Sequence, residues 1–415
     1  MTPAPDPRAA DGQLVRAIGP RALAASAINL TIGGGIFVLP PVIAAQLGPA
    51  ALVAYAVCGL AVALVLLCYA EAGSRVVSSG ARARTWFWFG YAAAADAAIA
   101  VALLGMVERV LPALREPAVR VIALGVVLGG LALLNIRGVR QGARAVELLT
   151  LIKLAPLIAL VVAGLFAVGA APPPVELPGV EALGAASLTL FFAFTGPDAA
   201  LMPSAEIVDP PRTVPRAIVL ATLGVVALYG ALHFVTQGLL GPDLARETSA
   251  PLAAAAGRLW GAAGGTLFVV AAAVSIFGAI AGDLLAAPRA VLASARQGGL
   301  PARFALIAVV IFALAATGTF QQLAVLASAT LLVVYGATVA AAFELRRRDV
   351  RAGGAPFQTP GGPVVPIVAM AVVVWLLAQT TWREQAGVGL LLMVASVLYA
   401  VRRLRTRQAV AEESV

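Results

Sequence analysis

Apolar residues gather in long runs along the whole chain, and short polar connectors separate the runs. Most runs are about 17–25 residues long, which is the length an α-helix needs to cross the hydrocarbon core of a bilayer. We therefore expect an all-α polytopic membrane protein with about twelve transmembrane helices. The predicted spans lie near 23–46, 50–73, 86–108, 118–136, 145–170, 183–206, 215–240, 260–287, 303–319, 322–344, 364–381 and 386–403.

Two of the predicted spans contain residues that interrupt helices. Gly33, Gly34 and Gly35 lie mid-way along span one, and Gly196-Pro197-Asp198 lies mid-way along span six. Glycine lets the backbone leave helical geometry, including into positive φ, and proline removes a backbone donor. The two breaks are five spans apart, a pattern typical of inverted-repeat transporters. The alternative for either break alone is close helix packing, since glycine often mediates contacts in membranes.

Composition and charge agree with a membrane protein. Hydrophobic residues make up 61% of the chain and charged residues only 12%, with a formal net charge of +9. With the N-terminus in the cytoplasm, 23 of the 29 Lys and Arg residues fall on cytoplasmic loops. This bias predicts that both termini are cytoplasmic. It also explains the basic charge without nucleic-acid binding.

Several other kinds of site have no support in the sequence. Cys58 and Cys68 both lie in span two, about 15 Å apart along a helix, which is too far for a disulfide. Phosphate loops, zinc-protease motifs and nucleophile elbows are absent from the sequence. We therefore expect no enzyme activity, no cofactor and no metal site.

Four stretches resemble the amino acid–polyamine–organocation (APC) permeases. They are "INLTIGGGIFVLP" (28–40), "YAEAGSRVVSSG" (69–80), "FFAFTGPDAALMPSAEIVDPPRTVPRAI" (191–218) and "GDLLAAPRAVLASARQGGLP" (282–301). The resemblance implies a LeuT-type fold, in which two inverted five-helix repeats precede two further helices. It also implies alternating access to a central amino-acid site in the cell (inner) membrane.

This fold divides the chain into five parts, with approximate boundaries. They are a cytoplasmic tail (1–22), the first repeat (23–170), the second repeat (171–319), the C-terminal helices (320–403, opened by span ten) and a cytoplasmic tail (404–415).

The resemblance also implies a substrate site at the two breaks. It places the substrate carboxylate on the amides of Gly33, Gly34 and Gly35, and the ammonium near carbonyls of span one and span six. Phe192 lies where relatives keep an aromatic residue that closes over the substrate, although ordinary core packing also explains it. The full set is Ile28, Thr31, Ile32, Gly33, Gly34, Gly35, Phe191, Phe192, Ala193, Phe194 and Gly196.

Lys153 is the only lysine, and it lies a turn or two into span five. Several APC permeases have a lysine here, where its ammonium resembles a built-in replacement for a sodium ion. The resemblance implies contacts with carbonyls near Thr31 and Ile32 and with the hydroxyl of Ser275. The alternative is a lysine that extends to the lipid headgroups.

Other ionisable residues within or near the spans are functional candidates, because burying them in a bilayer is costly. Asp96 and Asp198 could bind a cationic group, while Asp198 could instead cap a half-helix. His233 is more typical of a hydrogen-bonded packing residue. Glu71, Glu206 and Asp283, the last with Arg289, are candidates for cytoplasmic gate contacts.

The sequence thus predicts a secondary transporter of amino acids that is independent of sodium and either proton-coupled or an exchanger. Its partners would be a small-molecule amino acid and the lipid bilayer, with protons as a further candidate. Two alternatives remain open. One is a polyamine or organocation carrier, and the other is a membrane amino-acid sensor that does not transport.

Overall fold

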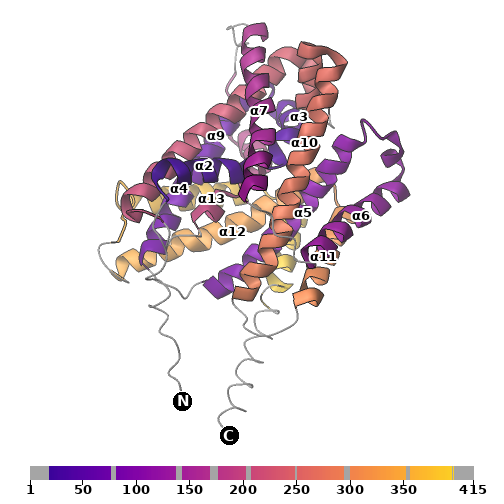
Figure 1. The fold of residues 1–415 in the computed structure, drawn as a ribbon. Helices are drawn as coiled ribbons and strands as arrows, with labels where there is room; N and C mark the ends of the chain where they lie inside the picture. The colour runs from indigo at the N-terminus through magenta and orange to yellow at the C-terminus, as the bar shows by residue number, and fades with distance from the viewer. Residues whose placement is uncertain are drawn as a thin grey trace.

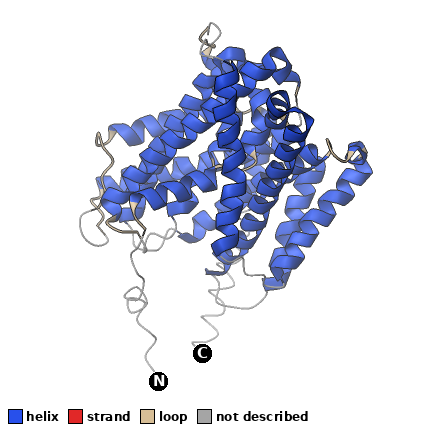
Figure 2. Cartoon of the chain, turned by 45° about the horizontal axis from the view of Figure 1, so that its top comes forward, coloured by secondary structure: helices blue, strands red, loops and turns tan. Residues whose placement is uncertain are grey.

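The computed structural model describes residues 18–75, 81–136, 143–168, 176–201, 207–247, 250–293, 300–351, 356–394 and 396. Within these ranges the chain is helical apart from turns, short connectors and one isolated parallel bridge between Ile18 and Ile207 (Figures 1 and 2). The predicted all-α class is therefore confirmed for the described part of the chain.

The helices follow one another with short connections. The α-helices are α2 (Pro20–Thr31), α3 (Gly35–Leu47), α4 (Ala51–Arg75), α5 (Ala81–Val107), α6 (Pro117–Ile136), α7 (Ala143–Val168), α8 (Val180–Phe191), α9 (Pro210–Leu240), α10 (Pro251–Ala293), α11 (Leu300–Thr317), α12 (Phe320–Arg347) and α13 (Val364–Leu377). Short 3₁₀ helices are η1 (Gly48–Ala50), η2 (Pro112–Arg115), η3 (Phe192–Phe194), η4 (Pro197–Leu201) and η6 (Gly241–Arg246). Gly261, with φ of 70°, interrupts α10 near the predicted start of span eight.

Five helical stretches among the described residues are long and apolar enough to cross a membrane. They are Gly35–Arg75, Gly90–Val107, Pro210–Arg246, Pro251–Ile280 and Phe320–Arg347. Val364–Leu377 and Trp382–Val394 form a sixth if the pair, bent by 115°, is one span. Shorter apolar helices overlap four more predicted spans, at Pro117–Leu133, Lys153–Val168, Val180–Phe194 and Ala308–Thr317. The count of twelve spans stays a prediction.

Span one is broken where the sequence predicts. Helix α2 ends at Thr31, Ile32 leaves helical geometry with ψ of 83°, and α3 begins at Gly35. Pro40 and Pro41 lie inside α3 without ending it.

Span six is also broken. Helix α8 ends at Phe191, Thr195 is extended, and Gly196 has φ of 103° before η4 begins at Pro197. Both predicted breaks are therefore confirmed as features of the backbone.

The broken helices lie within a bundle of longer ones. Helix α2 packs against α9 and η4, and α3 packs against α8. Helix α5 is enclosed by α10, α11 and α12, and its residues 90–104 are almost entirely buried. Figure 1 shows α7 beside α10 and, at the right of the view, α6 beside α11. The alanine-rich sequence of α5 suits this central position, because small side chains let helices approach closely in a membrane.

Candidate functional site

The two breaks are in direct contact. A Cβ atom added to Gly196 would lie 2.7 Å from the carbonyl oxygen of Leu30, and one added to Gly35 would lie 2.9 Å from Cα of Ala193. Both distances are shorter than any real Cβ contact, so glycine at these positions lets the two segments touch. The sequence-based expectation that the second break lies beside the first is confirmed.

One expectation about the glycines of the first break is wrong. Gly33, Gly34 and Gly35 do not have positive φ, and Gly34 has helical angles of −68° and −25°. At Gly34 and Gly35 the requirement for a small residue is steric instead. A Cβ at Gly34 would lie 3.3 Å from Ile99 of α5, whereas one at Gly33 would meet nothing closer than the Thr31 carbonyl at 4.0 Å. The positive φ that favours glycine occurs at Gly196 in the second break.

The first break begins with a tight turn. The Ile32 amide donates to the Ile28 carbonyl at 3.0 Å, and the Gly33 amide donates to the Thr31 carbonyl at 2.8 Å. With Ile32 at φ −74° and ψ 83°, the second bond closes an inverse γ-turn. The Gly33 amide is therefore already engaged. The Phe37 amide donates to the carbonyl of the N-cap residue Gly34 at 3.2 Å, and the amides of Gly34 and Gly35 lie before it at the positive end of α3.

Lys153 of α7 binds the C-terminal end of α2. Its Nζ donates to the carbonyls of Asn29 at 2.7 Å and Ile32 at 2.9 Å. The contact with Ile32 is as expected, and Asn29 takes the place expected for Thr31. The alternative that Lys153 extends to the headgroups is wrong for this structure. Ser275, the other predicted coupling residue, is buried on α10, which packs against α7.

The Thr31 carbonyl has a different partner, which the sequence analysis missed. Tyr229 of α9 donates its hydroxyl to this oxygen at 3.0 Å. The only signal in the sequence is a phenol in the middle of span seven, four residues before His233 and so on the same helix face.

Three phenylalanines of the second break are buried in aromatic contacts. Phe191 meets Tyr335 edge-on at 6.2 Å between ring centroids, Phe192 meets Phe320 at 5.8 Å, and Phe194 meets Tyr229 at 5.4 Å.

The backbone of the second break is held locally. The Thr195 hydroxyl donates to the Phe192 carbonyl at 2.8 Å. Tyr335 donates to Oδ1 of Asp198 at 3.1 Å, so this buried carboxylate is tied to α12.

Two further polar candidates, Asp96 and His233, are both buried. Asp96 is buried on α5, three residues before Ile99 and so on the helix face that meets Gly34. His233 is also buried, and its Nδ1 lies 3.3 Å from the Tyr55 hydroxyl. This contact fits the expected packing role.

Glu71 is fully buried at the end of α4 in an ionic network. It accepts hydrogen bonds from Arg75 at 3.0 Å, from Arg346 of α12 at 2.7 Å, and from the amide of Thr359 at 3.1 Å. The expected salt bridges of Glu71 are therefore present. Glu206 lies outside the described residues, as do the side chains of Asp283 and Arg289.

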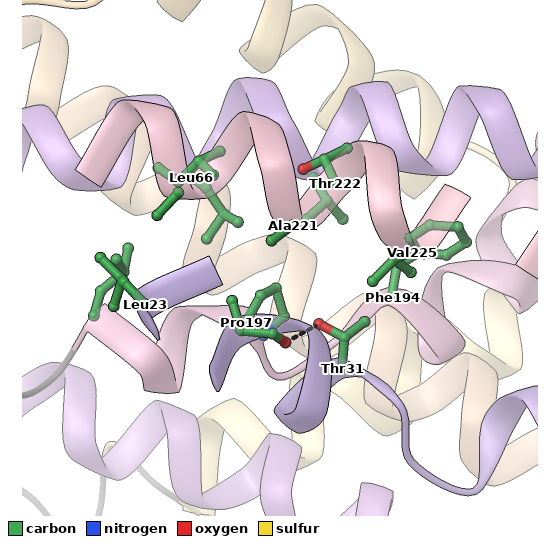
Figure 3. A pocket seen from close by; sticks show the side chains of 13 residues that line it. Leu23, Thr31, Leu66, Phe194, Pro197, Ala221, Thr222 and Val225 are labelled. Carbon is green, nitrogen blue, oxygen red and sulfur yellow. Dashed lines mark hydrogen bonds between the residues drawn. The ribbon is translucent and has the colours of Figure 1, made fainter. Parts of the chain in front are cut away.

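A small cavity of about 20 Å³, partly open to its surroundings, adjoins both breaks. Thr31, Phe194 and Pro197 form one side, and apolar side chains of α4 and α9 form the other (Figure 3). Figure 3 shows the Thr31 hydroxyl turned back to its own helix, where it donates to the Ala27 carbonyl at 2.7 Å. The cavity lies beside Thr31 and does not include Gly33, Gly34 or Gly35.

Comparison with known proteins agrees with this geometry. Residues 18–401 match the family model described as Amino acid permease. Three relatives illustrate the range of transporters that this chain is similar to. Vacuolar cationic amino acid transporter 2 of Arabidopsis thaliana is 28% identical over 70% of this chain and 51% of its own length. The methylthioribose transporter of Bacillus subtilis is 26% identical over 86% of this chain and 87% of its own length. A branched-chain amino acid permease of Lactococcus lactis is 26% identical over 86% of this chain and 88% of its own length.

The chain thus spans about half the length of the Arabidopsis protein and most of the length of the two bacterial ones. The family is one of transporters and not of enzymes, and its members are multi-pass membrane proteins with amino acids as the implied substrates. With two broken helices in contact and a family match along nearly the whole chain, this protein belongs to the amino acid permease family of the APC superfamily.

Proposed function

We propose that this protein is a secondary transporter of amino acids that works by alternating access. The observation that supports this most strongly is the contact between the two breaks, at Leu30–Gly196 and Gly35–Ala193. Non-helical backbone within a bilayer is tolerated where it lines a cavity or is buried in protein, and paired broken helices are where transporters of this kind bind substrate. The twelve spans and the two inverted five-helix repeats are part of the same proposal. The first repeat covers 23–170, and the second begins at 171 and runs through span ten to about 344.

The substrate would lie at the junction of the breaks, with its charges matched to the half-helix ends. The amides at the N-terminus of α3, those of the N-cap Gly34 and of Gly35, would bind the carboxylate, because the N-terminus of a helix attracts anions. Carbonyls of Phe191, Ala193 and Phe194 would accept from the ammonium group. Phe192 would close the site from outside.

Transport would be independent of sodium because Lys153 already supplies a cation to the first break. Its ammonium lies on two carbonyls at the negative end of α2. A lysine can also lose its proton when it is desolvated, which an arginine effectively cannot. Lys153, with Ser275 nearby on α10, is therefore the proposed coupling residue, in either proton-coupled transport or exchange.

We also propose that the protein lies in the cell (inner) membrane with both termini in the cytoplasm. The basic loops support this orientation. The buried pairs of Glu71 with Arg75 and Arg346 then lie near the inner face, where they would hold α4 against α12 as a cytoplasmic gate contact.

A carrier of polyamines or other organocations is the second candidate. Two buried carboxylates, Asp96 and Asp198, support it, since a second positive charge in the substrate needs a counter-charge. The hydrogen bond from Tyr335 to Asp198 gives that carboxylate a structural role as well.

Uptake into proteoliposomes tests the proposal. Purified protein is reconstituted and supplied with radiolabelled L-leucine, L-arginine or putrescine, with and without a sodium gradient. Saturable, sodium-independent uptake of an amino acid is expected. Uptake of putrescine alone would favour the organocation carrier. Binding of an amino acid without net or exchange flux would favour a sensor, and a strict sodium requirement would contradict the role of Lys153.

A further inference from the structure

Tyr229 contacts both breaks with one side chain. Its hydroxyl donates to the Thr31 carbonyl in the first break at 3.0 Å. Its ring packs edge-on against Phe194 in the second break, with 5.4 Å between centroids and 76° between planes. The residue has no exposed surface, and it comes from α9, which is part of neither broken span.

The Thr31 carbonyl accepts the hydrogen bond that closes the turn of the first break. It accepts from the Gly33 amide to close the inverse γ-turn, and its second lone pair is available to the Tyr229 hydroxyl. A buried carbonyl needs its partners, because the bilayer interior offers no water to replace them. The hydroxyl therefore fixes the point at which the chain leaves α2.

Side chains of two helices thus bind carbonyls at the end of α2. Lys153 of α7 holds the carbonyls of Asn29 and Ile32, and Tyr229 of α9 holds the carbonyl between them. Helix α9 also packs along α2, where a Cβ at Gly224 would lie 3.1 Å from Cδ1 of Ile28. The lysine supplies charge, whereas the tyrosine supplies a neutral donor with a rigid ring.

We propose that Tyr229 is a positioning residue for the substrate site, linking the first break to the second. Its hydroxyl sets the turn that leads into Gly34 and Gly35, while its ring sets the position of Phe194. The amides of one break and the carbonyls of the other are thereby oriented together. The transport part of this inference rests on the proposed function, and the backbone part does not.

Tyr55 offers a matched control. It lies in the same buried cluster, and its ring centroid is 6.4 Å from that of Phe194. Its hydroxyl, however, contacts Nδ1 of His233 and not the first break. Tyr55→Phe and Tyr229→Phe therefore each remove one buried phenol oxygen. Only Tyr229→Phe removes a hydrogen-bond donor from the Thr31 carbonyl.

Hydrogen–deuterium exchange of the purified full-length protein tests the backbone part. In Tyr229→Phe, the amides of Ile32 and Gly33 are expected to exchange about tenfold faster, the scale of one lost hydrogen bond. Tyr55→Phe should leave them unchanged. Tyr229→Leu, which also removes the ring, should in addition raise exchange at residues 191–196. Equal exchange at Ile32 and Gly33 in wild type and Tyr229→Phe would overturn the inference.

Uptake kinetics test the transport part with L-leucine and L-arginine as probes. Tyr229→Phe should raise KM about tenfold while kcat stays within about twofold, and Tyr55→Phe should change neither. A wild-type KM in Tyr229→Phe would overturn the positioning role while leaving the proposed function intact. If the wild-type protein transports neither L-leucine nor L-arginine, the proposed function is wrong for these two substrates. Hydrogen–deuterium exchange then still decides whether Tyr229 stabilises the backbone of the first break.

Discussion

The ammonium nitrogen of Lys153 lies 2.7 Å from the carbonyl oxygen of Asn29, inside the bundle and at the end of a half-helix. A second carbonyl, that of Ile32, lies 2.9 Å from the same nitrogen. The cation at the first break is therefore part of the chain. This relationship leads directly to the first prediction.

Removing the Lys153 ammonium should disable transport. In Lys153→Ala, the carbonyls of Asn29 and Ile32 lose a charged donor, so uptake is expected to fall more than tenfold. Lys153→Arg keeps the charge but changes its shape and prevents deprotonation, and it should restore little activity. Uptake of L-leucine and L-arginine into proteoliposomes, normalised to inserted protein, measures both. Undiminished flux in Lys153→Ala would show that the coupling role is wrong.

Asp198→Asn should be mild if the substrate is a neutral amino acid. The asparagine carbonyl can still accept from Tyr335, so the tie between η4 and α12 is kept. We expect KM for L-leucine to change by less than about threefold, which is below the effect of one lost hydrogen bond. The comparison with L-arginine is informative, because a large loss for arginine alone would assign Asp198 to binding of a cationic side chain.

Glu71→Gln should destabilise the protein strongly. Glu71 and Arg75 are 0% and 1% exposed, and Arg346 is 18% exposed, so losing the carboxylate charge leaves buried guanidinium groups without a counter-ion. Breaking a buried pair in this way costs about 3–5 kcal/mol. A lower melting temperature in detergent is expected.

Glu344→Gln provides the control for Glu71. Glu344 lies at the same end of α12 as Arg346, and it pairs with Arg347 and Arg348 at the surface. Exposed pairs contribute little, so this variant should melt like wild type. Equal melting temperatures for Glu71→Gln and wild type would contradict the structural importance of the network.

Gly196→Ala should prevent the second break from forming correctly. The residue has φ of 103°, and a Cβ would lie 2.7 Å from the carbonyl oxygen of Leu30. Both effects act on backbone and cannot be relieved by moving a side chain. Loss of folded protein in size-exclusion chromatography, or loss of substrate binding in the folded fraction, is expected. A folded variant with wild-type binding would contradict the observed contact.

The sequence predicted the features that depend on local chemistry. Clustered glycines and a Gly-Pro pair weaken a helix more than single ones do, so the breaks at Gly33–Gly35 and Gly196–Pro197 were evident from the pattern. The five-span separation indicated that they would meet. The single lysine within an apolar run indicated a special position for Lys153, and the resemblance to the APC permeases implied its contact with Ile32.

Features that depend on three-dimensional packing were not predictable. The acceptors of Lys153 are fixed by the rotation of α7 against α2, and Asn29 replaced Thr31 for this reason. Tyr229 lies about two hundred residues from Thr31 in sequence, and nothing local indicates their hydrogen bond. The requirement for glycine at Gly35 comes from the closeness of Ala193 and not from positive φ.

The central claim, that the junction of the two breaks binds the amino acid, is tested most directly by equilibrium binding of radiolabelled L-leucine and L-arginine to Gly35→Ala. The added Cβ would lie 2.9 Å from Cα of Ala193 and would push the breaks apart. Gly230→Ala on α9 is the control, because its Cβ would meet only Cδ2 of Leu52 at 3.9 Å. We predict that Gly35→Ala folds and inserts but loses binding of whichever amino acid wild type binds, while Gly230→Ala retains it. Wild-type affinity in a folded Gly35→Ala protein would contradict the claim.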